Sequence, residues 1–276
     1  MTFLTKAILT FAAAIFVFGI LPFGAMYFLQ GKLIFPAPDI IPPNSPVGSF
    51  SPVEIETPDG VRLRAWAHPA EGDEASILVF HGNADAAVYQ VRGKGEALVA
   101  AGFGVLLVEY RGYGGSSGSP SEVGLIRDGL ASYDYVRRQS ASPIGLYAHS
   151  LGTAVAIPVA ASRDVFAVAL ESPMTSILDV ARYRMGWVPL DGLMKYPFRS
   201  DLLIGSVRAP LFILHGTDDK VIPFSLGDRL AAMAPPGTRF MAIDSAGHNN
   251  LASFGTTGLA IEFFKETLAA KRRAEK

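Results

Sequence analysis

Short apolar runs alternate with helical segments along most of this 276-residue chain, and this alternation limits the possible folds more than any other feature. The apolar runs are typical of buried strands, because they are short and several end at glycine. The expected strands cover residues 76–82, 103–110, 144–149, 165–171, 210–216 and 239–244. The expected helices cover about 85–101, 121–139, 151–163, 224–233 and 250–270. This order predicts an α/β fold with a mostly parallel, doubly wound sheet.

A β-hairpin is expected before these strands, in "PVEIETPDGVRLRAWAHP" (52–69), where apolar and polar residues alternate around Pro58-Asp59-Gly60. Residues 36–49, "PAPDIIPPNSPVGS", contain many prolines and small polar residues, which predicts an irregular connector. Residues 172–207 contain no clear strand pattern and many Met, Tyr, Trp and Pro residues.

The front of the chain is strongly apolar, with no charge between Lys6 and Lys32. A helix that crosses the hydrocarbon core of a bilayer needs about 20 apolar residues. We therefore interpret residues 7–29 as a membrane-spanning helix within an anchor of residues 1–32, with the remaining domain in residues 33–276. Lys6 and the terminal amine precede the span. Because cations tend to stay on the cytoplasmic side, their position slightly favours a domain outside the cytoplasm.

A cleaved signal peptide is the main alternative for this segment, and a buried helix is a second one. Signal peptides end in a small-x-small cleavage site. The bulky Phe23 stands two residues before Ala25, which fits such a site poorly, and the apolar run continues beyond it.

Charge and cysteine content exclude several classes of function. The net charge is −1, so electrostatics provide no basis for nucleic-acid binding. The chain has no cysteine, which excludes disulfides, thiolate metal sites and a cysteine nucleophile. The sequence shows no metal-ligand cluster, and we expect neither a metal nor a cofactor.

The segment "YAHSLG" (147–152) contains the candidate nucleophile, Ser150, between an expected strand and an expected helix. This is the context of a nucleophile elbow, which requires small residues two positions before and after the serine. Those residues are Ala148 and Gly152, although the usual pattern has glycine at both. The alternative is an ordinary helix N-cap, for which serine is also favoured.

A serine nucleophile needs a histidine base and an acid that orients the base. Five histidines are present: His68, His81, His149, His215 and His248. Only His248, in "DSAGHNN", follows the last expected strand, as the order Ser, acid, His requires. We expect structural roles for the other four, with His149 pointing away from Ser150.

Candidate acids are Asp218 and Asp219 in "HGTDDKVIP", and Glu171 at the end of the preceding strand. A structural turn or cap is the alternative for the two aspartates. For the oxyanion, the N–H of Leu151 would be one donor, and the loop "HGNADA" would supply the other from Asn83 or Ala84.

These features together resemble the α/β-hydrolase family, and more closely its Bem46-like serine hydrolases. The segments that carry the resemblance are the N-terminal span, "LIFPAP", "FHGNAD", "EYRGYGGSSGSPSE", "AHSLG", "HGTDDKVIP" and "AGHNN", and they cover about residues 33–270. The resemblance implies ester or thioester hydrolysis without a cofactor. It also implies that Asp219 rather than Asp218 is the acid, that Arg111 is structural, and that residues 172–207 form a cap insertion.

The combined expectation is a membrane-anchored serine hydrolase with Ser150, Asp219 and His248 as catalytic residues and Asn83 and Leu151 at the oxyanion. In the cap, Met174, Tyr183 and Trp187 are candidate contacts for an apolar acyl substrate, because flexible and flat apolar side chains suit such a ligand. Two alternatives are a serine peptidase of the same fold and an interaction protein without catalysis. The latter is disfavoured, since all three catalytic positions hold competent residues.

Overall fold

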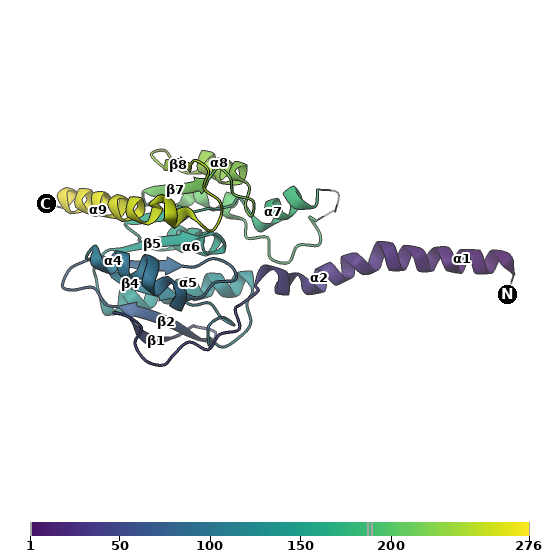
Figure 1. The fold of residues 1–276 in the computed structure, drawn as a ribbon, viewed down its shortest axis with the longest axis horizontal. Helices are drawn as coiled ribbons and strands as arrows, with labels where there is room; N and C mark the ends of the chain where they lie inside the picture. The colour runs from purple at the N-terminus through teal and green to yellow at the C-terminus, as the bar shows by residue number, and fades with distance from the viewer. Residues whose placement is uncertain (1, 187, 189, 276) are drawn as a thin grey trace.

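The computed structural model describes residues 2–186, 188 and 190–275, which form an eight-stranded sheet with helices on both faces and a long N-terminal helix (Figure 1). The strands are β1 (Ser51–Glu56), β2 (Arg62–His68), β3 (Ser76–Phe80), β4 (Gly104–Val108), β5 (Ile144–His149), β6 (Ala167–Glu171), β7 (Leu211–Gly216) and β8 (Arg239–Ile243). They lie in the order β1-β2-β4-β3-β5-β6-β7-β8. The β1–β2 and β2–β4 pairs are antiparallel, and the pairs from β4 to β8 are parallel. The predicted hairpin and the mostly parallel sheet are therefore confirmed.

The helices of the domain follow the predicted positions with two differences, and in addition α7 lies within residues 172–207, where no helix was predicted. They are α3 (Ala87–Gln90), α4 (Glu96–Ala100), α5 (Glu122–Gln139), α6 (Leu151–Ser162), α7 (Ile177–Arg184), α8 (Phe224–Met233) and α9 (Thr256–Ala274). The helix expected over 85–101 contains a π-helical turn, η2 (Val91–Gly95), between α3 and α4. The helix expected over 250–270 is interrupted at Gly255, whose left-handed φ of 79° separates a 3-10 turn, η5 (Leu251–Phe254), from α9.

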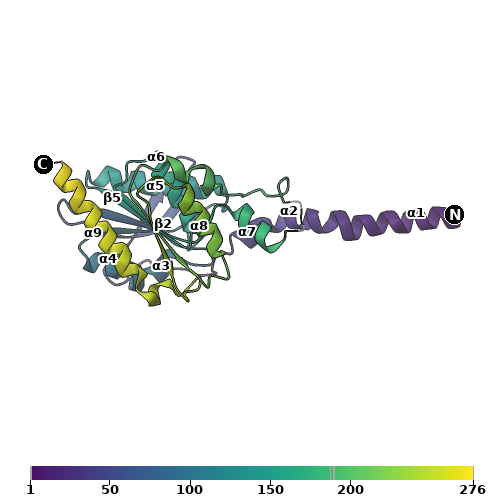
Figure 2. The same ribbon diagram turned by 90° about the horizontal axis from the view of Figure 1, so that it is seen from above.

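The sheet separates two apolar layers, because successive side chains of a strand point to opposite faces. In β3, Leu78 and Phe80 pack in the layer formed with α5, α6 and α8. Ile77 and Val79 pack in the layer formed with α3, α4 and α9. Figure 2 shows these two groups of helices on either side of the sheet. The continuous apolar strands noted in the sequence are thus buried on both faces.

A continuous helix from Phe3 to Ile34 extends from the domain (Figure 1) and comprises α1 (Phe3–Ala14), the π-helical segment η1 (Ile15–Ile20) and α2 (Leu21–Ile34). It is long and apolar enough to cross a membrane. A signal sequence can have the same length and hydropathy. Many of its large apolar side chains are exposed, Phe18 to 82%.

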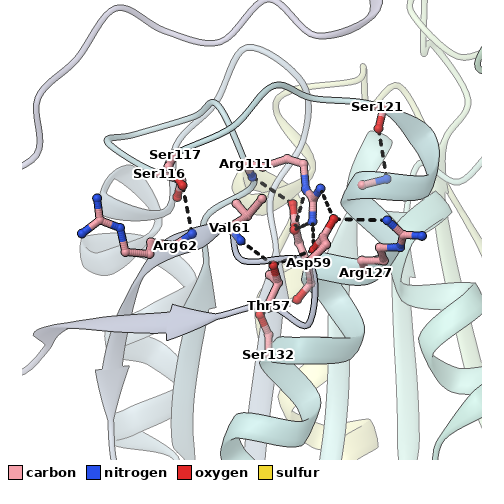
Figure 3. Close-up of polar contacts among 12 residues, drawn as sticks. Thr57, Asp59, Val61, Arg62, Arg111, Ser116, Ser117, Ser121, Arg127 and Ser132 are labelled. Carbon is pink, nitrogen blue, oxygen red and sulfur yellow. Dashed lines mark hydrogen bonds and ion pairs between the residues drawn. The ribbon is translucent and has the colours of Figure 1, made fainter.

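Arg111 joins three segments near the carboxyl end of β4 (Figure 3). Its Nε donates to Asp128 of α5 at 2.8 Å, and its Nη1 donates to Asp59 in the β1–β2 turn at 2.9 Å. Its hydrogen bond holds the pKa of the Asp59 carboxyl well below the usual range. Arg111 therefore fixes the β4–α5 loop to the hairpin, which agrees with the structural role expected for it.

Candidate active site

Ser150 lies on a sharp turn between β5 and α6. Its φ of 53° and ψ of −121° fall outside the regions that residues with a side chain usually adopt. The start of α6 packs closely against the end of β3 at this turn. Glycine at position 152 permits this packing, because a Cβ there would lie 2.4 Å from the carbonyl oxygen of Phe80. Ala148 is buried beside β3, so alanine fits where the usual pattern has glycine. Within the described chain the Ser150 side chain makes no helix-capping hydrogen bond, which argues against the N-cap alternative.

The hydroxyl of Ser150 begins a chain of two hydrogen bonds. Its Oγ lies 2.9 Å from Nε2 of His248, and Nδ1 of His248 lies 2.7 Å from Oδ2 of Asp219. All three side chains are buried. The structure thus brings together three residues that are separated by 69 and 29 positions in the sequence.

Asp219 is held as an ionised acceptor. Its Oδ1 accepts the backbone N–H groups of Val221 and Ile222, both at 2.8 Å. Burial alone would raise the pKa of this carboxyl, but hydrogen bonds from His215, His248 and the Ile222 N–H outweigh burial and hold the pKa well below its usual range. The carboxylate is therefore available to orient His248 and to balance a positive charge on it.

The other two candidate acids lie elsewhere. The Asp218 side chain is 64% exposed and faces Lys220 at 3.6 Å. Glu171 is buried and pairs with Lys94, and it accepts hydrogen bonds from Tyr147 at 2.7 Å and Thr256 at 2.6 Å. Burial would raise the pKa of Glu171, but the nearby Lys94 cation lowers it to about 2.

Three of the four remaining histidines contact neither Ser150 nor His248 directly, although His215 Nε2 also lies 3.4 Å from Oδ2 of Asp219. His68 Nδ1 bonds the Ser49 carbonyl, His81 Nε2 bonds Glu109, and His215 Nε2 bonds the Ile222 carbonyl, at 2.8–3.0 Å. These contacts agree with the structural roles expected for them.

The expectation that His149 points away from the site was wrong. The alternation of β5 places this side chain on the same face as Tyr147, next to the loop that carries His248. Its Nε2 lies 3.0 Å from the backbone carbonyl of His248, and the two rings are 5.0 Å apart. Burial lowers the pKa of His149 to about 4, so the neutral ring donates this hydrogen bond. His149 therefore supports the backbone of His248.

The loop after β3 approaches Ser150 from the other side. The Asn83 carboxamide oxygen accepts the N–H of Ala84 at 2.9 Å and the hydroxyl of Tyr113 at 3.3 Å. Ala84 has a φ of 52°, which turns the chain sharply at this point. Because the Ala84 N–H is already bonded to a side chain, Asn83 is the better of the two expected donors towards a substrate.

A pocket of about 350 Å³ opens above Ser150 and His248. Asn83 and Leu151 line it, together with Met174, one of the three expected cap contacts. Tyr183 is not among its described lining residues and is 69% exposed, because α7 turns Ile177 and Val180 to the pocket instead. Trp187 lies outside the described residues.

Sequence reasoning missed several apolar residues of this pocket. They are Leu33, Ile34, Ile177, Val180, Val221 and Ile222. Leu33 and Ile34 open the "LIFPAP" segment, so the motif was noted but its contact with the site was not. The pocket can therefore hold an apolar group next to the Ser150 hydroxyl.

The doubly wound sheet, the elbow serine and the His248 loop define the molecule as an α/β hydrolase. Residues 72–194 match the family described as "Hydrolase_4: Serine aminopeptidase, S33". The chain is 36% identical over 228 residues to the uncharacterized protein Rv2307c of Mycobacterium tuberculosis, covering 80% of this chain and 81% of that protein. It is also 36% identical over 192 residues to lysophosphatidylserine lipase ABHD12 of Macaca fascicularis, covering 60% of this chain and 47% of that protein.

The fold comparison agrees with these sequence matches. The structure is similar to the esterase Pf2001 of Pyrococcus furiosus, with a TM-score of 0.69 and 20% identity over 83% of this chain and 98% of that chain. The chain belongs to the α/β-hydrolase family and is a hydrolase, as the sequence resemblance predicted.

Proposed function

We propose that this hydrolase is a membrane-anchored serine enzyme that cleaves carboxylic esters or thioesters through an acyl-enzyme intermediate. The observation that carries the proposal is the chain of hydrogen bonds from Ser150 Oγ through His248 to Asp219, at 2.9 and 2.7 Å. These distances are within the range needed for direct proton transfer between nucleophile and base.

In the first half-reaction, His248 Nε2 takes the proton from Ser150 Oγ as this oxygen attacks the substrate carbonyl carbon. The N–H groups of Asn83 and Leu151 stabilise the resulting oxyanion. Asp219 balances the charge of the imidazolium, which then gives its proton to the departing alcohol or thiol. In the second half-reaction, His248 activates a water that releases the carboxylic acid and restores Ser150.

The test is hydrolysis of p-nitrophenyl butyrate, alongside short peptide amides, by wild type and Ser150→Ala. We expect wild type to prefer the ester, and Ser150→Ala to lose both turnover and fluorophosphonate labelling. Ser225→Ala, at an exposed serine of α8, serves as the control and should retain both. Undiminished labelling of Ser150→Ala would show that a different serine reacts.

Two other outcomes would favour the alternatives. Preferential cleavage of the amides would indicate a serine peptidase, an activity that the description of the matched family also names. Wild-type protein that neither labels nor hydrolyses any substrate would indicate an interaction protein.

For the membrane part of the proposal, residues 7–29 cross the bilayer as the core of an anchor over residues 1–32. The hydrolase domain follows over residues 33–276, with its cap over 172–207. At 1.5 Å per residue, residues 7–29 span about 35 Å, which exceeds a hydrocarbon core of about 30 Å. Full-length protein should therefore stay with membranes after high-salt and carbonate washing. Recovery of soluble protein that begins near Met26 would instead indicate a cleaved signal peptide.

A further inference from the structure

The last turns of α2 make specific hydrogen bonds and packing contacts with the domain. The buried Gln30 donates from Nε2 to the Leu193 carbonyl at 2.8 Å and accepts the Lys195 N–H at 2.7 Å. The Phe35 ring, just after the helix, packs edge-on against Tyr196 with centroids 5.2 Å apart. These contacts fix the helix against the cap segment, residues 172–207.

Apolar contacts extend this interface. Phe23 and Met26 of α2 pack against a small cluster that contains Leu178 of α7 and Leu190 of the cap segment. In Figure 1 the loop that follows α7 passes between α7 and α2, and in Figure 2 both helices lie at the same end of the sheet. The helix and the cap therefore form one surface next to the pocket.

This arrangement places two helix residues in the pocket wall. Leu33 and Ile34 line the same pocket as Ser150 and His248. Ile34 is half-buried and packs against the core, whereas Leu33 is 69% exposed. Leu33 therefore forms part of the pocket mouth.

The mouth lies close to the expected membrane surface. Tyr27 and Lys32 are residue types that anchor spanning helices at the interface between lipid and water. The Lys195 cation lies 3.9 Å from the centre of the Tyr27 ring, so the cap segment also reaches this level. Leu33 follows Tyr27 by six positions, which corresponds to about 9 Å along the helix.

We propose that the final turn of α2 forms the outer wall of the acyl-binding site, with Leu33 as a residue that determines acyl-chain length. The substrates are amphiphilic esters or thioesters whose acyl chain passes from the bilayer surface along α2 to Ser150. This inference rests on the proposed hydrolase function. A long acyl chain that starts at Ser150 reaches Leu33, whereas a short chain remains among the inner residues such as Met174.

The test compares full-length Leu33→Ala with Leu29→Ala in lipid nanodiscs, using p-nitrophenyl laurate and butyrate. Leu29 is an exposed leucine of the same helix that is not among the pocket-lining residues. Leu33→Ala should lower the laurate-to-butyrate ratio of kcat/KM about tenfold, the size expected when an apolar pocket loses methylene contacts. Leu33→Met, which keeps the side-chain volume, should restore most of this ratio, and Leu29→Ala should leave both rates unchanged.

An unchanged ratio in Leu33→Ala, or an equal change in Leu29→Ala, would overturn the assignment of the wall. Butyrate hydrolysis that survives Ser150→Ala would overturn the proposed function and the inference with it. The two failures are distinguishable, because the first concerns chain length alone and the second concerns the nucleophile.

Discussion

Replacing Asp219 with asparagine should disable His248 while removing little side-chain volume. Oδ1 of Asp219 faces the N–H groups of Val221 and Ile222, and Oδ2 faces His248 Nδ1. The asparagine oxygen would stay with the two backbone donors, since an NH2 group there would meet two N–H groups. Its NH2 group would then donate to His248 Nδ1.

This reversal changes the tautomer of the histidine. With Nδ1 as the acceptor, the ring proton sits on Nε2, which faces Ser150 Oγ at 2.9 Å. His248 can then no longer accept the proton of the serine. In the best-known Ser-His-Asp enzyme the same tautomer error costs about 10⁴-fold in rate. Such a loss corresponds to about 5.5 kcal/mol of transition-state stabilisation at 1.36 kcal/mol per tenfold.

The measurement is kcat/KM for p-nitrophenyl butyrate, with fluorophosphonate labelling rates and thermal unfolding on the same samples. Asp218→Asn is the matched control, because this neighbouring carboxylate is largely exposed and should change the rate less than about twofold. A larger loss of rate in Asp218→Asn than in Asp219→Asn would contradict the assignment of Asp219 as the acid. Folded Asp219→Asn that retains more than about a tenth of the wild-type rate would contradict it as well.

Two further predictions concern stability. Glu171 has a pKa of about 2 in the folded chain, below its ordinary value of about 4.5. Its ionised form therefore adds about 3 kcal/mol to the free energy of unfolding above pH 4.5, and this contribution is lost as the pH falls towards 2. Glu171→Gln should therefore be clearly less stable than wild type to urea at pH 7, with a difference that shrinks below pH 4.5; a constant difference at all pH values would contradict this. Gly152→Ala should destabilise the fold by about 1–3 kcal/mol or more, because the new Cβ would meet the Phe80 carbonyl oxygen. The control is Gly258→Ala in α9, where the new Cβ has open space, and this change should be neutral or stabilising by up to about 1 kcal/mol. Calorimetry of both variants in nanodiscs measures this, and a Gly152→Ala protein that melts at the wild-type temperature would refute the steric argument.

Local sequence patterns determined most of the secondary structure. The strand over 144–149 and the helix over 224–233 were predicted to the residue, because apolar periodicity and flanking turn residues act within a few positions of each other. The break at Gly255 was missed, since nothing in the local pattern shows that this glycine adopts a left-handed φ. Ser150 and His248 could be selected from local context and chain order, because the nucleophile elbow and the last loop each have a short sequence signature.

The tertiary structure decided which side chains meet. From the residues alone, Asp218, Asp219 and Glu171 remained open as acids, and the family resemblance favoured Asp219. In the fold the Asp218 carboxylate is exposed to solvent, whereas the Asp219 carboxylate, one position later, lies 2.7 Å from His248. The pairing of Glu171 with Lys94 spans 77 positions, and the contact of His149 with the His248 carbonyl spans 99.

The contribution of the N-terminal helix to the pocket was likewise decided by the tertiary structure. Hydropathy identified residues 7–29 as a candidate span, because solvent preference is a property of the segment itself. The positions of Leu33 and Ile34 beside Ser150 depend on packing between α2 and a cap segment that begins more than a hundred residues later. Such contacts are determined by the three-dimensional packing of whole elements, which no local pattern of residues encodes.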